Sequence, residues 1–304
     1  MSASASIRRF RVIHQTRYEY ALPVDLCHNE AHLEPRVSPG QRRIASRLLI
    51  DPAPDSLHQR LDYFGNPVHY FAVRLPRRQL VVTAESAVEV VTRADPLEGV
   101  LRDSPPWEDV RAKLEGSREP AVLEARELGL ASPMIEPSPA LREFAAPSFP
   151  PGRPVFEAVA DLSRRIHREF AYDPEFSTIA TPLAEVLERR RGVCQDFAHL
   201  AIGCVRALGL PARYVSGYIE TQPASGRERL RGADASHAWF AAYAPHVGWL
   251  DFDPTNDQNP PRRHITTAWG RDYGDVTPLK GVLFGGGEHT LEVAVEVEEL
   301  AASL

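Results

Sequence analysis

The spacing of apolar residues changes twice along this chain, and that change restricts the fold more than any other feature. Residues 1–95 contain short runs rich in Val, Tyr and Phe, separated by turn signals such as FGNP at 64–67. Residues 154–208 instead carry apolar side chains at helical spacing, and beyond residue 210 the spacing returns to two. Because a period of two is typical of strands and a period of about 3.6 is typical of helices, the pattern predicts an α+β protein.

Three regions follow from this pattern. We expect an N-terminal antiparallel, β-sandwich-like domain at 1–95, a helical connector at 96–153, and a core at 154–304 in which helices pack on an antiparallel sheet. Proline interrupts the connector in DSPPWEDV, EPSPALREF and FPPGRP, but its content of Leu, Ile and Phe predicts that it packs on both neighbours. A C-terminal strand at 290–298 is assigned to the core.

Within the core we expect three helices followed by strands. The first begins near residue 154, the second begins at Thr181-Pro182, and the third runs from about 193 to 208, where Gly209 and then Pro211 end it. Strands are expected at 212–220, 237–245 and 248–254.

Composition argues against several kinds of partner. The 304 residues carry a formal net charge of −6 without a basic stripe, so no nucleic acid is expected to bind. No window approaches the ~18 apolar residues of a membrane span, and the N-terminal MSASASIRRF has no apolar segment of a secretory signal. The 3 cysteines are a sparse, odd set that does not suit a disulfide framework. We therefore expect a cytoplasmic protein with no membrane partner.

The segment RGVCQDFAHL at 191–200 raises the question of function, because Cys194 is either a small core residue or a nucleophile. It lies at the start of the expected helix, shortly after a glycine. Free backbone N–H groups and the positive end of the helix dipole stabilise a thiolate there, and the same N–H groups can donate to an oxyanion. Cys204 lies in the middle of this helix on its apolar stripe, and Cys27 lies in the β domain, so both are expected to be structural.

A nucleophilic cysteine needs a base and a group that orients the base. His237 begins an expected strand after a polar loop, where it either faces a cleft or is an exposed strand-end residue. Asp251 and Asp253 share one face of the next strand. The short turn APHVG joins the two strands in a hairpin, so the start of one meets the end of the other, which predicts that His237 lies near Asp253. His199 is on a different face of the helix from Cys194 and is expected to be structural.

Metal and phosphate sites are not expected. No CxxC, HxH or HExxH spacing occurs, and GGG at 285–287 lacks the Lys-Ser/Thr of a phosphate loop. The sequence therefore predicts chemistry without a metal or a cofactor.

With these residues assembled, the chain resembles the bacterial transglutaminase-like superfamily. The matching segments of the core are RGVCQDFAHL, RALGLPARYVSGY, SHAWFAAYAPHVGWLDFDPTND and GRDYGDVTPLKGV, while RYEYALPV and LDYFGNPVHYF resemble the β domain that precedes such a core. The resemblance spans nearly the whole chain. It implies a papain-like arrangement, with the cysteine on a helix and the other two groups on an antiparallel sheet.

The resemblance also implies roles for individual residues. Cys194 would be the nucleophile, His237 the general base and acid, and Asp253 the residue that orients the histidine. Trp239 matches a His-x-Trp pattern and is expected to pack beside these three. Tyr172, in FAYDP, is the candidate for an oxyanion donor in addition to the backbone N–H of Cys194.

The implied reaction is acyl transfer on a peptide or protein amide through a thioester. Hydrolysis, as in a protease or amidase, is the preferred outcome because the cytoplasm supplies water everywhere. An amine acceptor would instead make the chain a transglutaminase or peptide ligase. A different class of function also stays open, in which the same fold binds a peptide or a protein partner without catalysis.

Overall fold

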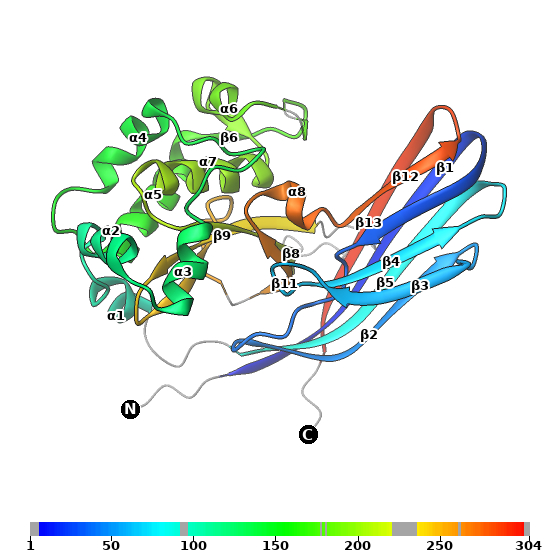
Figure 1. Ribbon diagram of the computed structural model, residues 1–304, viewed down its shortest axis with the longest axis horizontal. Helices are drawn as coiled ribbons and strands as arrows, with labels where there is room; N and C mark the ends of the chain where they lie inside the picture. The colour runs from blue at the N-terminus through cyan, green and yellow to red at the C-terminus, as the bar shows by residue number, and fades with distance from the viewer. Residues whose placement is uncertain are drawn as a thin grey trace, which may run out of the picture.

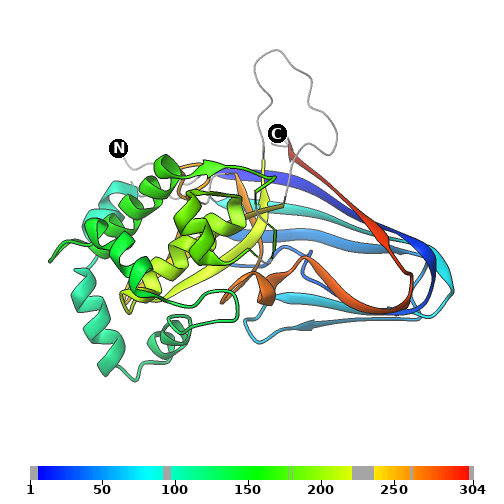
Figure 2. The same cartoon turned by 90° about the horizontal axis from the view of Figure 1, so that it is seen from above.

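A computed structural model of the protein describes residues 6–91, 97–176, 178–179, 181–220, 236–260 and 263–300. Figure 1 shows a long curled sheet beside a core of helices and a smaller sheet, and Figure 2 shows that the smaller sheet lies between the helices and the long sheet. The expected α+β class is confirmed. In the part of the chain described, no helix is long and apolar enough to cross a bilayer.

The long sheet is built around one strand, β1. Its order is β2-β5-β1-β4-β3, and β12 and β13 also pair with β1, all antiparallel. Alternate side chains of β1 are buried, as a period of two predicts, and they form an apolar core with β4 and β5. The strands are β1 (Ile7–Ala31), β2 (Gln41–Asp51), β3 (Ser56–Leu61), β4 (Pro67–Val73), β5 (Arg77–Val91), β12 (Leu279–Gly285) and β13 (His289–Leu300).

The C-terminal strand is placed differently from our expectation. A strand was expected at 290–298, and β13 covers it, but β13 pairs with β1 of the N-terminal domain and not with the core sheet. The adjacent strand β12 pairs with β1 as well. The assignment of all of 154–304 to the core is therefore wrong for the last two strands. An alternating pattern shows that a segment is a strand, but it does not show which sheet accepts it.

The core sheet has the order β10-β9-β8-β11 and is antiparallel. The amphipathic helices α5 and α7 cover one of its faces, and their buried side chains form a single apolar cluster with the sheet. The elements are α5 (Val155–Glu169), α6 (Leu183–Arg189), α7 (Cys194–Ala207), β8 (Ala212–Ile219), β9 (Ser236–Ala244), β10 (Gly248–Phe252), β11 (His264–Gly270) and α8 (Tyr273–Val276), with a short parallel pair of β6 (Ala171–Tyr172) and β7 (Arg191–Gly192).

The connector is an integral part of this core. It forms α1 (Leu97–Arg102), α2 (Trp107–Gly116), α3 (Pro120–Glu127), α4 (Pro139–Ala145) and a 3₁₀ turn at Ala146–Ser148. Buried residues of α2, α3 and α4 belong to the same apolar cluster as α5 and α7. The Tyr63 hydroxyl of the β domain donates to the Glu127 carboxylate of α3 at 2.8 Å. The connector therefore contacts both neighbours.

The β domain covers the exposed edge of the core sheet. β11 is an edge strand, and the side chain of Gln41 accepts from the Thr266 N–H at 2.8 Å and donates to its carbonyl at 2.7 Å. Asn66 makes the same pair of contacts with the backbone of Trp269, both at 2.9 Å. Tyr218 and Ile265 complete an apolar cluster with buried residues of β1, β5 and β13. These contacts satisfy the edge of β11 and fix the two domains to each other.

Gly217 lets strands β8, β9 and β11 lie close to one another at the end of the core sheet. A β-carbon on this residue of β8 would lie 2.0 Å from the Ile265 carbonyl oxygen and 2.8 Å from the Trp239 ring. The Trp239 ring therefore extends from β9 across β8, and it meets the His264 ring of β11 at 5.1 Å between centroids.

We predict that Gly217→Ala lowers the free energy of unfolding by at least about 2 kcal/mol, because the added methyl group must displace backbone atoms. Gly116→Ala is the matched control, since nothing lies within 4 Å of a β-carbon there. Urea unfolding followed by circular dichroism measures both changes. Equal midpoints for the two variants would contradict this account of Gly217.

Candidate active site

Cys194 is the first residue of α7, and the turn that carries it is fixed by local contacts. The Asp196 carboxylate accepts a hydrogen bond from the Val193 N–H at 2.8 Å. Gly192 makes this possible, because a β-carbon there would lie 2.7 Å from the same carboxylate. The Cys194 side chain is partly exposed at the N-terminus of the helix, where backbone N–H groups lack intrahelical acceptors. It is thus accessible and lies in a positive local field.

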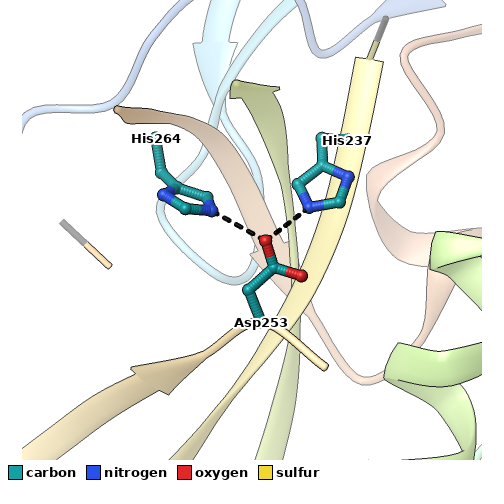
Figure 3. Close-up of side chains that lie close together, drawn as sticks. All are labelled: His237, Asp253 and His264. Atoms are coloured by element: carbon teal, nitrogen blue, oxygen red, sulfur yellow. Dashed lines mark hydrogen bonds and ion pairs between the residues drawn. The ribbon is translucent and has the colours of Figure 1, made fainter. Parts of the chain in front are cut away.

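His237 and Asp253 meet at one end of the core sheet. His237 is the second residue of β9, and Asp253 directly follows β10, whose Phe252 pairs with Phe240 of β9. The Nε2 atom of His237 lies 2.8 Å from Oδ2 of Asp253 (Figure 3). The structure thus places the two residues as the hairpin geometry predicted.

Asp253 is fully buried and accepts hydrogen bonds at both carboxylate oxygens. Oδ1 accepts from the backbone N–H groups of Thr255 at 3.0 Å and Asn256 at 3.3 Å. Oδ2 accepts from His237, from His264 at 2.9 Å and from the Asn256 amide at 2.8 Å. Burial opposes ionisation, but the hydrogen bonds from the two histidines outweigh it and hold the pKa of Asp253 far below its usual range. The carboxylate is therefore ionised.

The contact with Asp253 determines which nitrogen of His237 is available. Nε2 carries the proton donated to Asp253, so Nδ1 is the nitrogen left for the Cys194 thiol, which is near enough to the ring to raise its pKa. Burial lowers the pKa of His237, but the hydrogen bonds to Asp253 and Cys194 and the charge of Asp253 raise it to about 10. The ring is therefore a cation at neutral pH, placed between a thiol and a carboxylate.

His264 and Asn256 are site residues that the sequence analysis missed. His264 begins β11 and donates to the same carboxylate oxygen as His237 (Figure 3). Burial lowers the pKa of His264, so this ring is neutral and carries its proton on Nε2. Asn256 contacts Asp253 and lies 3.3 Å from Nε2 of His237. No spacing motif marks either residue, but the polar run that follows Asp253 was a signal for Asn256.

Trp239 and Tyr172 both lie close to this group, in different ways. The Trp239 ring is fully buried, stacks on His237 at 6.0 Å between centroids and donates to Asp251 at 3.2 Å. Tyr172 is 57% exposed, and its strand β6 pairs with β7 directly before Cys194. Burial, and then the nearby Cys194, raise the pKa of Tyr172. Trp239 thus packs beside the histidine as expected, and Tyr172 remains a candidate donor beside the thiol.

The other cysteines and His199 are buried away from this group. Cys204 is fully buried in the apolar cluster, and burial raises the pKa of its thiol. Cys27 accepts a hydrogen bond from Asn29 inside the β domain. His199 accepts from the Tyr273 N–H at 3.1 Å, and burial lowers its pKa to about 4. The three residues have the structural environments expected of them.

His237, Asp253 and His264 also form a cluster whose ligand atoms lie within 4.8 Å of one another, close enough for a metal. A tetrahedral zinc ion would separate a nitrogen and an oxygen ligand by about 3.3 Å, given bond lengths near 2.0 Å. The two observed distances between nitrogen and oxygen are 2.8 and 2.9 Å. These distances fit direct hydrogen bonds better than a shared metal.

Comparison with known proteins identifies the family of the chain. The family description "Bacterial transglutaminase-like N-terminal region" matches residues 10–89, and "Transglutaminase-like superfamily" matches residues 143–254. An uncharacterized protein of Mycobacterium bovis is 43% identical over 98% of this chain and 97% of its own length. A protein-glutamine gamma-glutamyltransferase of Pseudomonas aeruginosa is 30% identical, but over 42% of this chain and 22% of that protein.

A solved structure has the same fold. It comes from Cytophaga hutchinsonii, is described as a "putative cysteine protease", and superposes with a TM-score of 0.75 at 19% identity, covering 98% of this chain and 93% of the other. Together with the family matches, this shows that the chain belongs to the transglutaminase-like superfamily and carries the bacterial type of N-terminal region.

Proposed function

We propose that this protein is a cysteine-dependent acyltransfer enzyme that cleaves amide or peptide bonds through a thioester. The observation that supports this most strongly is the position of His237, hydrogen-bonded to Asp253 on one side and within reach of the Cys194 thiol on the other. A nucleophile, a base and an orienting carboxylate in this order are the arrangement that such chemistry needs.

The first half of the reaction starts from the Cys194 thiolate and the His237 cation. Sulfur attacks the carbonyl carbon of the amide, and the carbonyl oxygen becomes an oxyanion that the Cys194 backbone N–H stabilises, with the Tyr172 hydroxyl as the second donor. The C–N bond then breaks, and Nδ1 of His237 gives its proton to the leaving amine. The products of this half are a free amine and a thioester on Cys194.

In the second half, a water molecule attacks the thioester. Neutral His237 takes one proton from this water through Nδ1, the C–S bond breaks, and a carboxylic acid leaves as the thiolate and the imidazolium form again. Asp253 does not receive a proton at any point, because its hydrogen bonds hold it ionised. It stabilises the His237 cation and keeps Nδ1 directed at the sulfur.

The exposure of the site favours water as the acceptor. Cys194 is partly exposed, and the neighbouring Tyr172 is 57% exposed, so solvent can reach a thioester without a conformational change. A transglutaminase would need a site dry enough to protect that thioester until an amine arrives. The relative named as a protein-glutamine gamma-glutamyltransferase keeps amine transfer as the alternative.

We predict that Cys194 reacts with iodoacetamide at pH 6 much faster than Cys204 or Cys27. Thiolate is the reactive form, and only Cys194 combines exposure with a nearby imidazolium, whereas Cys204 is fully buried. Peptide mapping by mass spectrometry measures the rate at each residue. Equally slow alkylation at all three positions would favour a binding protein without catalysis.

Turnover provides the second test. A screen of the pure protein against peptides, glutamine amides and amine pairs, followed by mass spectrometry, should detect cleavage that Cys194→Ala abolishes and Cys204→Ala leaves largely intact. Undiminished cleavage by Cys194→Ala would contradict the proposed mechanism, and products that incorporate the amine instead of water would select the alternative acceptor.

Asp253→Asn should reduce turnover by about 10⁴, by analogy with serine proteases that have the same triad. It should also change the pH dependence of alkylation. The charge of Asp253 raises the pKa of His237, and an imidazolium next to a cysteine in general favours the reactive thiolate. Without that charge the His237 pKa falls, so the acidic limb of the alkylation profile should move to higher pH.

Asp257→Asn is the control for this prediction. Asp257 is exposed in the same loop and has a φ of 50°, a conformation that asparagine tolerates well. The acidic limb of the alkylation profile of Asp257→Asn should lie at the same pH as that of the wild type. An unmoved limb in Asp253→Asn would show that Asp253 does not control the charge of His237.

A further inference from the structure

A large cavity lies between the β domain and the core sheet, on the side away from α7. Its volume is about 1130 Å³, slightly above the range of roughly 300–1,000 Å³ that is usual for small-molecule sites. The β domain contributes the segments around Arg36 and Phe64, and the core contributes residues of β8, β10, β11 and α3. Neither Cys194 nor His237 is among its described lining residues. The cavity therefore does not contain the nucleophile or the base of the proposed acyl transfer.

Arg213 is the unusual residue of this cavity. Its side chain comes from β8, the residue is 9% exposed, and its guanidinium lies 4.5 Å from the Trp249 ring and 3.7 Å from the Trp269 ring. The described residues offer it no hydrogen-bond acceptor, and its Nε is buried without a partner. A guanidinium has five N–H donors, and leaving a buried cation without acceptors is costly. The two tryptophans fix the group but do not replace a hydrogen-bonding anion.

Arg36 also packs on the Trp269 ring, but unlike Arg213 it has hydrogen-bond acceptors. Its guanidinium lies 3.5 Å from the centroid of the Trp269 ring, and it donates to Asn66 and to the Phe64 carbonyl. Burial lowers the pKa of both arginines to about 10, so both are cations at neutral pH. The inner wall of the cavity thus carries two cations beside the Asp251 carboxylate, whose charge acts on Arg213, and one of the two cations lacks hydrogen-bond acceptors among the described residues.

We propose that this cavity binds an organic carboxylate, which Arg213 receives through its guanidinium while the apolar body of the ligand contacts Trp249 and Trp269. A planar guanidinium matches a carboxylate in two parallel hydrogen bonds. Glu124 and Glu127 of α3 are exposed and also line the cavity, so a multiply charged anion such as a polyphosphate would be repelled. One carboxylate on an apolar or aromatic body, such as a small aromatic acid or a peptide C-terminus, fits both features.

One lining residue of the cavity also contacts the triad. His264 lines the cavity and donates through Nε2 to Asp253, while its Nδ1 is buried without a partner. Binding in the cavity is nevertheless a separate claim from catalysis, because it does not need the thiol. The test can therefore be made in protein that lacks Cys194.

Isothermal titration calorimetry on full-length Cys194→Ala protein tests the proposal. One arm compares phenylacetate with phenylacetamide, and the other compares the tripeptide Ala-Ala-Phe with its C-terminal amide. Each pair differs in the carboxylate alone, and the two arms distinguish a small acid from a peptide end. We expect at least one carboxylate to bind at least about tenfold more tightly than its amide, because a charge-assisted hydrogen bond contributes more than about 1.4 kcal/mol.

Substitutions assign the effect to Arg213. In the same Cys194→Ala background, Arg213→Met keeps much of the side-chain volume without the charge and should weaken carboxylate binding at least about tenfold. Arg213→Lys keeps the charge without the planar fork and should give an intermediate loss. Arg164→Met, which removes an exposed charge of α5, is the control and should bind as well as the parent. Circular dichroism shows whether each variant is folded.

Three results would overturn the proposal: no binding of either carboxylate, equal binding of acid and amide, or undiminished carboxylate binding by folded Arg213→Met. If Arg213→Met does not fold, the comparison rests on Arg213→Lys, which must then bind more weakly than the parent. Failure of this test leaves the proposed catalysis unaffected, and absence of turnover leaves carboxylate binding unaffected.

Discussion

The hydrogen bond between His237 and Asp253 is the interaction on which the rest of the site depends. It selects the tautomer of the histidine, leaves Nδ1 for the thiol, and raises the pKa of the ring to about 10. The carboxylate can do this because two backbone N–H groups, the Asn256 amide and His264 also donate to it while it is fully buried. A buried carboxylate with this many donors stays ionised, and its charge is felt strongly by the neighbouring ring.

The geometry of this hydrogen bond depends in turn on how the strands are held. His264 belongs to β11, an edge strand whose backbone is satisfied by Gln41 and Asn66 of the β domain. The apolar cluster at the junction includes Ile265, directly after His264. The β domain therefore has a structural role in the site, because it fixes the strand that supplies the second histidine that donates to Asp253. The interface between the β domain and the core also encloses the cavity that contains Arg213. Both proposed sites therefore depend on this interface.

Much of the site followed from local patterns in the sequence. The glycine shortly before the expected helix predicted that Cys194 lies at a helix N-terminus. The short hairpin predicted the contact between His237 and Asp253. His264 was missed because its role depends on β11 pairing with β8, a contact between strands far apart in the sequence. Arg213 was missed because a charged residue within a strand reads as exposed, and its burial between two tryptophans appears only in three dimensions. The pairing of β13 with β1 was missed for the same reason.

The ionisation of His237 is the most direct test of this account. Nitrogen-15 NMR of histidine-labelled protein reports the protonation of each ring nitrogen, and a His237→Gln sample assigns the signal. The account predicts an imidazolium at neutral pH, with Nε2–H bonded to Asp253, which loses its proton only near the raised pKa of about 10. A His237 ring that is neutral at pH 7, or whose hydrogen-bonded proton is on Nδ1, would contradict the account at its centre.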